Sequence, residues 1–351
     1  MNNPPDSIDA QSMTPAERDR TVYDSSLDRH NTRGGGKVKP KICLAMPLYN
    51  QTKFLEEALQ SLLAQTYSDF RLIIVDDSTE LAPGNIVKRF TARDSRIHYI
   101  KNDSRKGLVG NWRACFKHAG NADYFAWVGD HDVWHPEWLE KMVHTLNENP
   151  NVVLVYPIFV RITPEGSIND KPSRYFSADN MSDFRRIKAV CRDARAFGKM
   201  VYGLFRADAL RRAGIFRRLM YPDVVLLHEL CLQGDFKQVE EKLWFIRRVS
   251  KFSIDRQKNS LFVRKAWYIY LPWTLVNAVA LAWNTAIASD ARNLRQRCLG
   301  ICVAFMYFFR YIGKLGTGSW IGSYYEWTRG KKPWMKKLKQ RIQGKSQIKT
   351  N

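Results

Sequence analysis

Between residues 41 and 162, short apolar runs alternate with longer stretches in which apolar residues recur every three or four positions. The short runs are typical of strands buried on both faces, and the longer stretches are typical of amphipathic helices. We predict strands at 42–46, 71–75, 97–100, 124–128 and 152–162, and helices at 54–64, 84–93, 111–119 and 136–147. This alternation predicts an α/β fold with a mixed, mostly parallel, Rossmann-like sheet covered by helices on both faces.

The pattern is less regular after residue 162. Residues 163–195 are polar and rich in loop-forming residues, and 238–247 is predicted to be a last strand. Between them, 223–233 has the spacing of an amphipathic helix with Val224, Leu227 and Cys231 on one face. Residues 1–38 show no periodicity and are predicted to be a flexible arm.

Two of the predicted strands end in pairs of carboxylates, Asp76/Asp77 and Asp130/Asp132. Each pair alone could be an Asp-rich turn. The carboxyl ends of parallel strands lie at one edge of a sheet, so both pairs should border the same crevice. Acidic groups there need a positive partner, and a divalent cation carrying a phosphate would provide one. The coincidence therefore favours a nucleotide–metal site.

The chain is basic, and its charge is unevenly distributed. Of a net charge of +22 over 351 residues, the part from Arg256 onward has 18 Lys and Arg against two acidic residues. A basic C-terminal third indicates an anionic partner surface, either lipid or nucleic acid. The six cysteines form no C-x-x-C pair and are predicted to be reduced core thiols, and no secretory signal precedes the first strand.

Residues 266–289 contain no charged residue and are long enough to span a bilayer. Pro272 and several Asn and Thr residues reduce their hydrophobicity, and the following chain is rich in Trp, Tyr and Lys. Aromatic and basic residues together favour the membrane–water interface, so helices in the membrane plane are preferred over spanning ones. An ordinary helical subdomain with a solvated tail is the alternative.

The order and spacing of several motifs resemble the inverting glycosyltransferases of family 2, which have the GT-A fold. The motifs are I-C-L-A-M-P-L-Y-N at 42–50, L-I-I-V-D-D-S at 72–78, Gly110-Asn111, Asp130-His131-Asp132, Gly203-Leu204-Phe205-Arg206, and the segments 223–236 and 243–248. The resemblance covers about 41–250. It implies a GT-A domain at 39–255, and the composition adds the flexible arm at 1–38 and a basic, aromatic-rich helical region at 256–351 that is predicted to associate with a membrane.

The resemblance assigns nucleotide-binding roles to five residues. Pro47 and Tyr49 would line the base and ribose, and Asp77 would accept a hydrogen bond from a uracil-type base. Asn111, with Lys106 nearby, falls in the segment that faces the nucleotide in the family.

The metal and catalytic roles fall on carboxylates. Asp132 would be the principal ligand of Mg²⁺ or Mn²⁺, and Asp130 would contact the ribose or the metal. Asp223 matches the general base, but it lacks the usual acidic neighbour, which leaves Glu229 as the alternative. The frequent third carboxylate after Asp132 is replaced by Val133, and the Q-x-x-R-W motif of processive members is absent, which favours transfer of a single sugar.

The leading hypothesis is a metal-dependent glycosyltransferase at the cytoplasmic face of a membrane. It would use a nucleotide-diphosphate sugar, most plausibly a UDP-sugar, and a glycan or lipid-linked acceptor. The alternatives are a nucleic-acid-binding protein or a non-catalytic scaffold that uses the basic C-terminal tail. The acidic strand ends count against a nucleic-acid partner because they would repel a phosphate backbone.

Overall fold

The computed structural model describes residues 42–312, apart from 170–172, 174, 193–196, 248–259, 262–265 and 289–292. The arm predicted at 1–38 and the aromatic, basic sequence after residue 312 lie outside the described part. The strands are β1 (Ile42–Leu48), β2 (Phe70–Asp76), β3 (Ile97–Lys101), β4 (Tyr124–Trp127), β5 (Val133–Trp134), β6 (Val152–Ile162), β7 (Leu204–Arg206) and β8 (Asp235–Arg247). The helices are α2 (Leu55–Leu63), α3 (Ala82–Thr91), α4 (Gly107–Lys117), α5 (Trp138–Glu148), α6 (Asp183–Arg192), α7 (Phe197–Met200), α8 (Ala207–Ala213), α9 (Pro222–Leu230), η2 (Trp267–Tyr270), α11 (Trp273–Ala282), η3 (Trp283–Ile287) and α12 (Leu294–Ile312).

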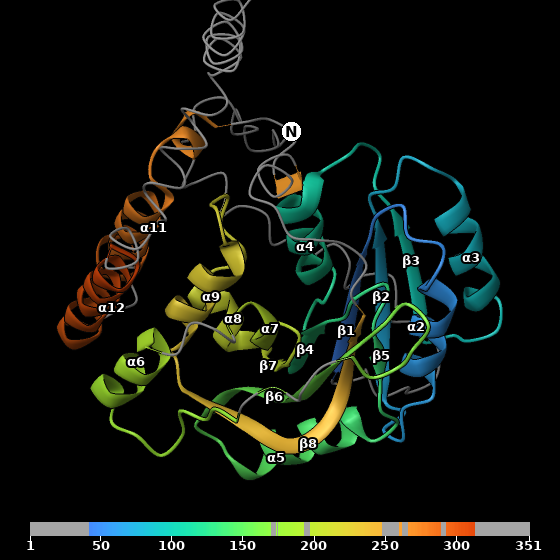
Figure 1. Ribbon diagram of the computed structural model, residues 1–351, viewed down its shortest axis with the longest axis horizontal. Coiled ribbons are helices and arrows are strands. Elements are labelled where there is room, and N and C mark those ends of the chain that lie inside the picture. Colours follow the sequence, from blue (N-terminus) through green and yellow to red (C-terminus); the bar gives the residue numbers. More distant parts are fainter. Residues whose placement is uncertain are drawn as a thin grey trace, which may run out of the picture.

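The described strands form one sheet in the order β3-β2-β1-β4-β7-β6-β8-β5 (Figure 1). Strands β3, β2, β1 and β4 are all parallel, so their carboxyl ends meet at one edge. Strand β7 is antiparallel to both neighbours, and β5 is antiparallel to β8, whereas β6 and β8 run parallel. The predicted mixed, mostly parallel sheet is confirmed.

The sheet is buried on both faces, as the continuous apolar runs predict. Side chains alternate between the two faces along a strand. In β1, Cys43 and Ala45 face a core formed with α4, α8 and α9, while Leu44 and Met46 face a core formed with α2, α3 and α5. Both faces of the sheet are therefore covered by helices, and the open positions are left at the strand ends.

Helix α9 differs from the amphipathic helix predicted at 223–233. It runs from Pro222 to Leu230, and its residues are buried on nearly all sides. Leu226 and Leu227 pack in the core beside the sheet, while Val225 packs on the opposite side against α11 and α12. The prediction of a single apolar face was wrong because a second helical layer covers the side that would otherwise be exposed to solvent.

The apolar stretch at 266–289 does not form one helix. A 3₁₀ turn, η2, precedes Pro272, and α11 then continues into the π-helical η3. Helices α11 and α12 lie side by side against α9 and α6, at the end of the molecule away from β1–β3 (Figure 1). Among the described residues, no helix combines the length and the apolar character needed to cross a membrane.

The cysteines are free thiols, as predicted, but they do not all lie in the core. Cys43, Cys115, Cys191 and Cys231 are buried, Cys302 is half-buried and Cys298 is exposed. The prediction of core thiols is therefore wrong for Cys298, because α12 turns the face that carries it away from the domain.

Candidate active site

A small cavity of about 130 Å³ lies at the carboxyl ends of β1 and β2, beside the first turns of α4. Four of the residues predicted to bind the nucleotide line it together: Pro47, Tyr49, Asp77 and Asn111. The other lining residues are Arg105, Gly107, Leu108, Trp112 and Ser260. The structure thus brings together residues that lie more than sixty positions apart in the sequence.

Asp77 forms the floor of this cavity and caps helix α4. Its carboxylate accepts hydrogen bonds from the backbone amides of Lys106 (2.7 Å) and Gly107 (2.8 Å) and from the Asn102 side-chain amide (2.9 Å). Gly107 has φ +73°, a conformation that favours glycine. Three of about four acceptor positions of the carboxylate are occupied, so one remains for a donor such as the N–H of a base. Asp76 faces away from the cavity and accepts from Tyr99 Oη (2.7 Å).

Asn111 is buried beneath the cavity and holds the ends of two strands together. Its Nδ2 donates to the carbonyls of Val75 (3.0 Å) and Leu48 (3.3 Å), and its Oδ1 accepts from the Asn102 side chain (3.0 Å). With these bonds made, Asn111 positions the strand ends and borders the ligand space. Lys106, in contrast, contributes its backbone amide, and its exposed side chain is not among the lining residues.

Arg105 occupies the position that the sequence suggested for Lys106. Its guanidinium lies 4.8 Å from the centroid of the Tyr49 ring, and both residues line the cavity. Tyr49 is 44% exposed, so one face of its ring remains available for stacking against a base. A planar aromatic ring next to a guanidinium is suited to a nucleobase that carries an anionic tail.

Asp132 is buried where the chain leaves β4. Its Oδ2 accepts from Trp244 Nε1 (3.1 Å) and its Oδ1 from the Arg247 backbone amide (2.9 Å), so β8 fixes both oxygens. Burial raises the pKa of Asp132 above its ordinary value, although His131, the Arg247 amide, Lys199 and the Trp244 indole each act to lower it. These contacts therefore do not fully offset the free-energy cost of burying the ionised Asp132 carboxylate.

Asp130 lies beside His131 and is more accessible than Asp132. Its Oδ1 is 2.5 Å from His131 Nδ1, while His131 Nε2 is 3.9 Å from Asp132 Oδ1. Burial lowers the pKa of His131, but the hydrogen bond to Asp130 and the charges of both carboxylates outweigh it, so that pKa is raised overall. The imidazole thus lies between the two carboxylates, and their negative charges favour its protonated form.

Asp223 reaches the same crevice from the first turn of α9. A Cβ added to Gly198 of α7 would lie 2.5 Å from Asp223 Oδ2, so only a glycine fits against this carboxylate. Burial raises the pKa of Asp223, despite its position at a helix N-terminus and the nearby Lys199. A carboxylate whose proton affinity is raised in this way is suited to act as a general base.

Lys199 and Tyr202 connect the three carboxylates. Burial lowers the pKa of Lys199, while Asp132 and Asp223 act to raise it, so its ammonium lies in the field of both. Burial also raises the pKa of Tyr202, and Asp132, Asp130 and Asp223 add to that rise. Tyr202 packs against Trp112 of the small cavity at 5.4 Å between ring centroids. The Trp112–Tyr202 contact therefore links the lining of the cavity to the residue on which the three carboxylates act.

Glu229, the alternative base, lies two helical turns from Asp223 and outside this crevice. It is buried, and its Oε1 accepts from Arg217 Nε at 2.5 Å. Six helical residues separate the two side chains by about 9 Å along the axis of α9, so they cannot serve one reacting centre. The geometry assigns Glu229 to a buried ion pair and leaves Asp223 facing the site.

The carboxylates Asp130 and Asp132 fit a divalent cation whose remaining ligands come from elsewhere. Hard cations such as Mg²⁺ and Mn²⁺ take oxygen ligands and commonly complete their coordination with substrate phosphates and water. No group of three or more His, Cys, Asp or Glu side chains among the described residues has the arrangement of a complete metal site. The observation that favours a bound cation is that Asp130 and Asp132 approach the two nitrogens of one imidazole, His131, at 2.5 and 3.9 Å, so two carboxylates lie close together.

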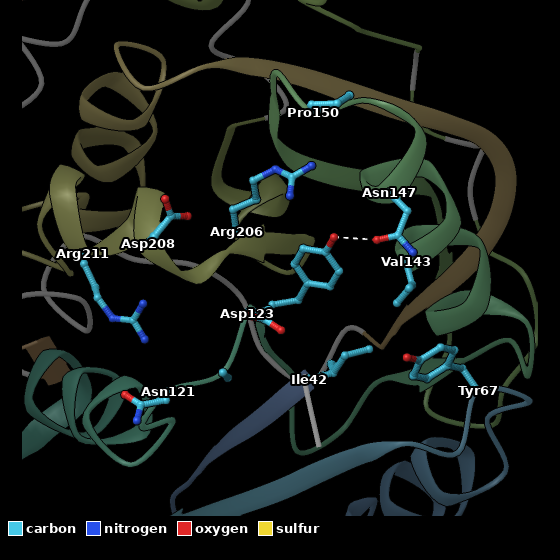
Figure 2. Close-up of a pocket in the computed structure, with 12 residues that line it drawn as sticks. Ile42, Tyr67, Asn121, Asp123, Val143, Asn147, Pro150, Arg206, Asp208 and Arg211 are labelled. Atoms are coloured by element: carbon cyan, nitrogen blue, oxygen red, sulfur yellow. Dashed lines mark hydrogen bonds between the residues drawn. The ribbon is translucent and has the colours of Figure 1, made fainter. Parts of the chain in front are cut away.

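A larger cavity, of about 600 Å³, lies at the opposite edge of the sheet (Figure 2). It is lined by Ile42 and Tyr124, which begin β1 and β4. Tyr124 Oη donates to Asn147 Oδ1 (2.6 Å), and Arg206 donates to the carbonyls of Val152 (2.8 Å) and Leu146 (2.6 Å). These groups are already engaged, and parallel α/β sheets bind ligands at the carboxyl edge, so we do not place the active site here.

Sequence reasoning missed Arg105, Trp112, Lys199, Tyr202 and Trp244. Lys199 and Tyr202 stand just before the motif at 203–206, and a lysine followed by Met-Val-Tyr in an apolar context was the available signal. The role of Trp244 had no local signal because its contact with Asp132 spans 112 positions.

Comparison with known proteins identifies the family. The family model described as glycosyl transferase family 2 matches residues 43–210. An uncharacterized glycosyltransferase of Methanocaldococcus jannaschii is 30% identical over 251 residues, which cover 69% of this chain and 80% of that protein. The chain belongs to glycosyltransferase family 2. This confirms the resemblance noted in the sequence.

Other glycosyltransferase relatives match over shorter segments. An uncharacterized glycosyltransferase of Haemophilus influenzae is 23% identical over 210 residues, and the chain spans 59% of its length. The chain spans 42% of the Bacillus subtilis protein EpsE, to which it is 33% identical over 117 residues. The fold is similar to that of Staphylococcus aureus TarS 1–349 in complex with UDP-GlcNAc, with a TM-score of 0.57 at 14% identity over 79% of this chain and 74% of that one.

Proposed function

We propose that this family 2 protein transfers a single sugar from a nucleotide-diphosphate sugar to an acceptor hydroxyl, with inversion at the anomeric carbon. The observation that carries the proposal is the cavity at the carboxyl ends of β1 and β2, which Pro47, Tyr49, Asp77, Arg105 and Asn111 line together. Its Trp112 packs against Tyr202, whose pKa the carboxylates Asp132, Asp130 and Asp223 help to raise. The aromatic, Arg-containing cavity suits the nucleobase of a donor, and the carboxylates beside it suit the diphosphate–sugar part.

A UDP-sugar is the proposed donor. The remaining acceptor position of Asp77 suits the N–H of a uracil-type base, and Tyr49 offers a ring face for stacking. The TarS structure of similar fold was solved with UDP-GlcNAc, which supports a uridine nucleotide in this fold. Arg105, which lines the same cavity, would face the anionic part of the donor.

Asp132, with Asp130, would hold Mg²⁺ or Mn²⁺ against the diphosphate. A bound cation stabilises the negative charge that develops on the leaving nucleotide diphosphate. Trp244 and the Arg247 amide fix the Asp132 carboxylate in one orientation, which keeps its position constant as that charge develops. Lys199, whose pKa burial lowers and Asp132 and Asp223 act to raise, would add a positive charge to the same region when protonated.

Asp223 is the proposed general base. The acceptor oxygen attacks the anomeric carbon from the side opposite the diphosphate, the carbon–phosphate-oxygen bond breaks with its electron pair on the leaving group, and the hydroxyl proton passes to Asp223. General-base catalysis of this kind typically contributes about 10²–10⁴-fold. The raised pKa of Asp223 makes it a better proton acceptor than an ordinary aspartate.

The acceptor is proposed to be a glycan or a lipid-linked molecule at the cytoplasmic face of a membrane, and no nucleic-acid partner is proposed. The support comes from the basic C-terminal sequence, with 18 Lys and Arg against two acidic residues from Arg256 onward. Such a region is attracted to anionic lipid headgroups.

The test is release of nucleoside diphosphate across a panel of UDP- and GDP-sugars with Mn²⁺. We expect release from at least one UDP-sugar and a decrease of about 10²–10⁴-fold in Asp223→Asn. Glu229→Gln is the control on the same helix, and it should retain the rate while losing thermal stability, because Arg217 loses its ionised partner. An unchanged rate in Asp223→Asn would contradict the assignment.

A further inference from the structure

Helices α11 and α12 bury one side and leave a row of large apolar side chains exposed on the other. The buried side mixes polar residues, such as Asn277, with large apolar ones, such as Leu281 and Tyr307. The outward side is formed by Leu271, Leu275, Val279, Trp283 and Ile287 along α11 and η3, and by Leu294, Cys298, Ile301, Phe305 and Phe309 along α12. We refer to these ten residues as the outer apolar face.

The spacing of these residues makes each row of the outer apolar face continuous along its own helix. Along α11 and η3 they recur at every fourth position, and along α12 they recur at every third or fourth, which places neighbours on one side of a helix. The nine large side chains among them are between 44% and 78% exposed. A contiguous exposed apolar surface of this kind marks an interaction site rather than ordinary surface variation.

Polar contacts on the inner side fix this orientation. Asn277 Nδ2 donates to the Met220 carbonyl (2.8 Å) and lies 2.9 Å from Tyr307 Oη. The Trp273 ring packs 4.7 Å from Tyr221, at the start of α9. Rolling the helices to bury the outer apolar face would break these buried hydrogen bonds, which is costly. The exposed face is therefore a stable feature of the fold.

The charge of these helices and of the sequence after them is predominantly basic. Helices η2, α11, η3 and α12 contain Arg295, Arg297 and Arg310 and no Asp or Glu, and of the three Arg295 is paired with Asp183 of α6 at 2.7 Å. The sequence that follows, residues 313–351, has ten Lys and Arg against a single Glu. An apolar face flanked by basic residues complements an anionic lipid surface.

We propose that the outer apolar face inserts into the headgroup–acyl boundary of an anionic lipid bilayer, with α11 and α12 lying in the membrane plane. The inner side of both helices packs along α9 and α6, which leaves only the outer side to meet lipid. A second copy of this chain is disfavoured as the occupant because it would bring two strongly basic C-terminal regions together.

This arrangement places the crevice beside the bilayer, a consequence that rests on the proposed function. Trp273, at the start of α11, packs against Tyr221, two residues before Asp223, at 4.7 Å between ring centroids, so the helix pair lies close to the proposed base. An acceptor approaching Asp223 from this side would come from the membrane surface.

The test is flotation of the full chain, without substrate, with vesicles of equal parts phosphatidylglycerol and phosphatidylcholine. The chain should float with the vesicles, and Leu275→Gln and Phe305→Gln should each weaken partitioning by about tenfold. Leu81→Gln is the matched control, since Leu81 is 81% exposed but precedes α3. These side chains are exposed, so the melting temperature should not change in any of the three variants. Sugar transfer is not measured here, so either proposal can fail without the other.

A second readout uses Cys298, the exposed thiol on the outer apolar face. An environment-sensitive dye attached there should shift to the blue on vesicles, and a Cys298→Ser protein treated in the same way should not. Vesicle binding that is unchanged in Phe305→Gln, with no dye shift, would show attachment through basic residues alone and overturn the proposal. A dimer without vesicles that dissociates in Phe305→Gln would also overturn it in favour of a second copy.

Discussion

Two acidic residues on one helix, Asp223 and Glu229, show how environment separates roles that sequence leaves open. Glu229 is paired with Arg217 at 2.5 Å and buried. Asp223 packs against Gly198, and burial raises its pKa although the nearby Lys199 acts to lower it. The first arrangement stabilises a charge for the fold, and the second leaves a carboxylate ready to accept a proton.

The raised pKa of Asp223 predicts a pH dependence of activity. The base must be ionised, so kcat/KM should fall as pH decreases through a value above the ordinary 3.8. The acid limb of the pH profile, measured with saturating Mn²⁺, should therefore lie above that value. An acid limb at or below 3.8 would contradict the assignment of Asp223 as the base.

Ionisation of Asp223 is expected to raise activity but to lower the stability of the fold. A carboxyl group with a raised folded-state pKa stabilises the fold below its unfolded-state pKa, and this contribution is lost as pH rises through the folded-state value. The melting temperature of Asp223→Asn minus that of the wild type should therefore increase as pH rises from the unfolded-state pKa of Asp223 to its folded-state pKa. An Asp208→Asn control, exposed at the other sheet edge, should not show the same trend.

Lys199 is predicted to stabilise the departing diphosphate. A charge-assisted hydrogen bond of this kind is worth about 1.5–3 kcal/mol, so Lys199→Gln should lower kcat about 10- to 100-fold with a smaller change in KM. Lys199→Arg should restore part of the rate because the charge is kept. Lys242→Gln, on an exposed part of β8, is the control. Steady-state kinetics unchanged in Lys199→Gln would refute this role.

At the scale of elements, the sequence predicts the sheet better than it predicts the helices around it. The strand predicted at 152–162 coincides with β6, and the acidic strand ends do lie on the parallel edge. Buried strands are continuous apolar runs, so their signal is local. Helix α4, in contrast, begins four residues before its predicted start because Asp77, 30 positions away, caps it.

The same distinction applies to the site. Pro47, Tyr49, Asp77, Asp130 and Asp132 follow strands and could be placed from sequence order alone. Lys199 and Trp244 could not, because their positions relative to Asp132 depend on how β7 and β8 are inserted into the sheet. The face of α9 was predicted wrongly for a related reason: the α11–α12 layer that covers it comes later in the chain.

Close packing between α12 and η3 yields a prediction at this scale. A Cβ at Gly300 would lie 2.5 Å from Thr285 Oγ1, so Gly300→Val should force the two segments apart and cost about 1–3 kcal/mol in the free energy of unfolding. Nucleotide affinity should be unchanged because the crevice is formed by other elements. Cys298→Val, exposed on the same helix, should be nearly neutral. Equal denaturation midpoints for both variants would contradict this packing.

At the scale of the molecule, the sheet and the helix pair have separate tasks. The carboxyl edge of β1, β2 and β4 carries the candidate site, and the α11–α12 pair lies at the end of the molecule away from β1–β3 (Figure 1). The outer apolar face of that pair is exposed. Asp223 on α9 lies between the two. The proposed activity and the proposed membrane contact thus meet at one helix.

The central claim is that Asp132 organises a metal-dependent nucleotide site, and calorimetric titration with UDP in the presence and absence of Mn²⁺ tests it most directly. We predict tight binding that needs Mn²⁺ and weakens about 10- to 100-fold in Asp132→Asn, a loss usual for groups that support a metal site. Asp208→Asn should bind as the wild type does. UDP binding that is independent of Mn²⁺ and unaffected by Asp132→Asn would contradict the account.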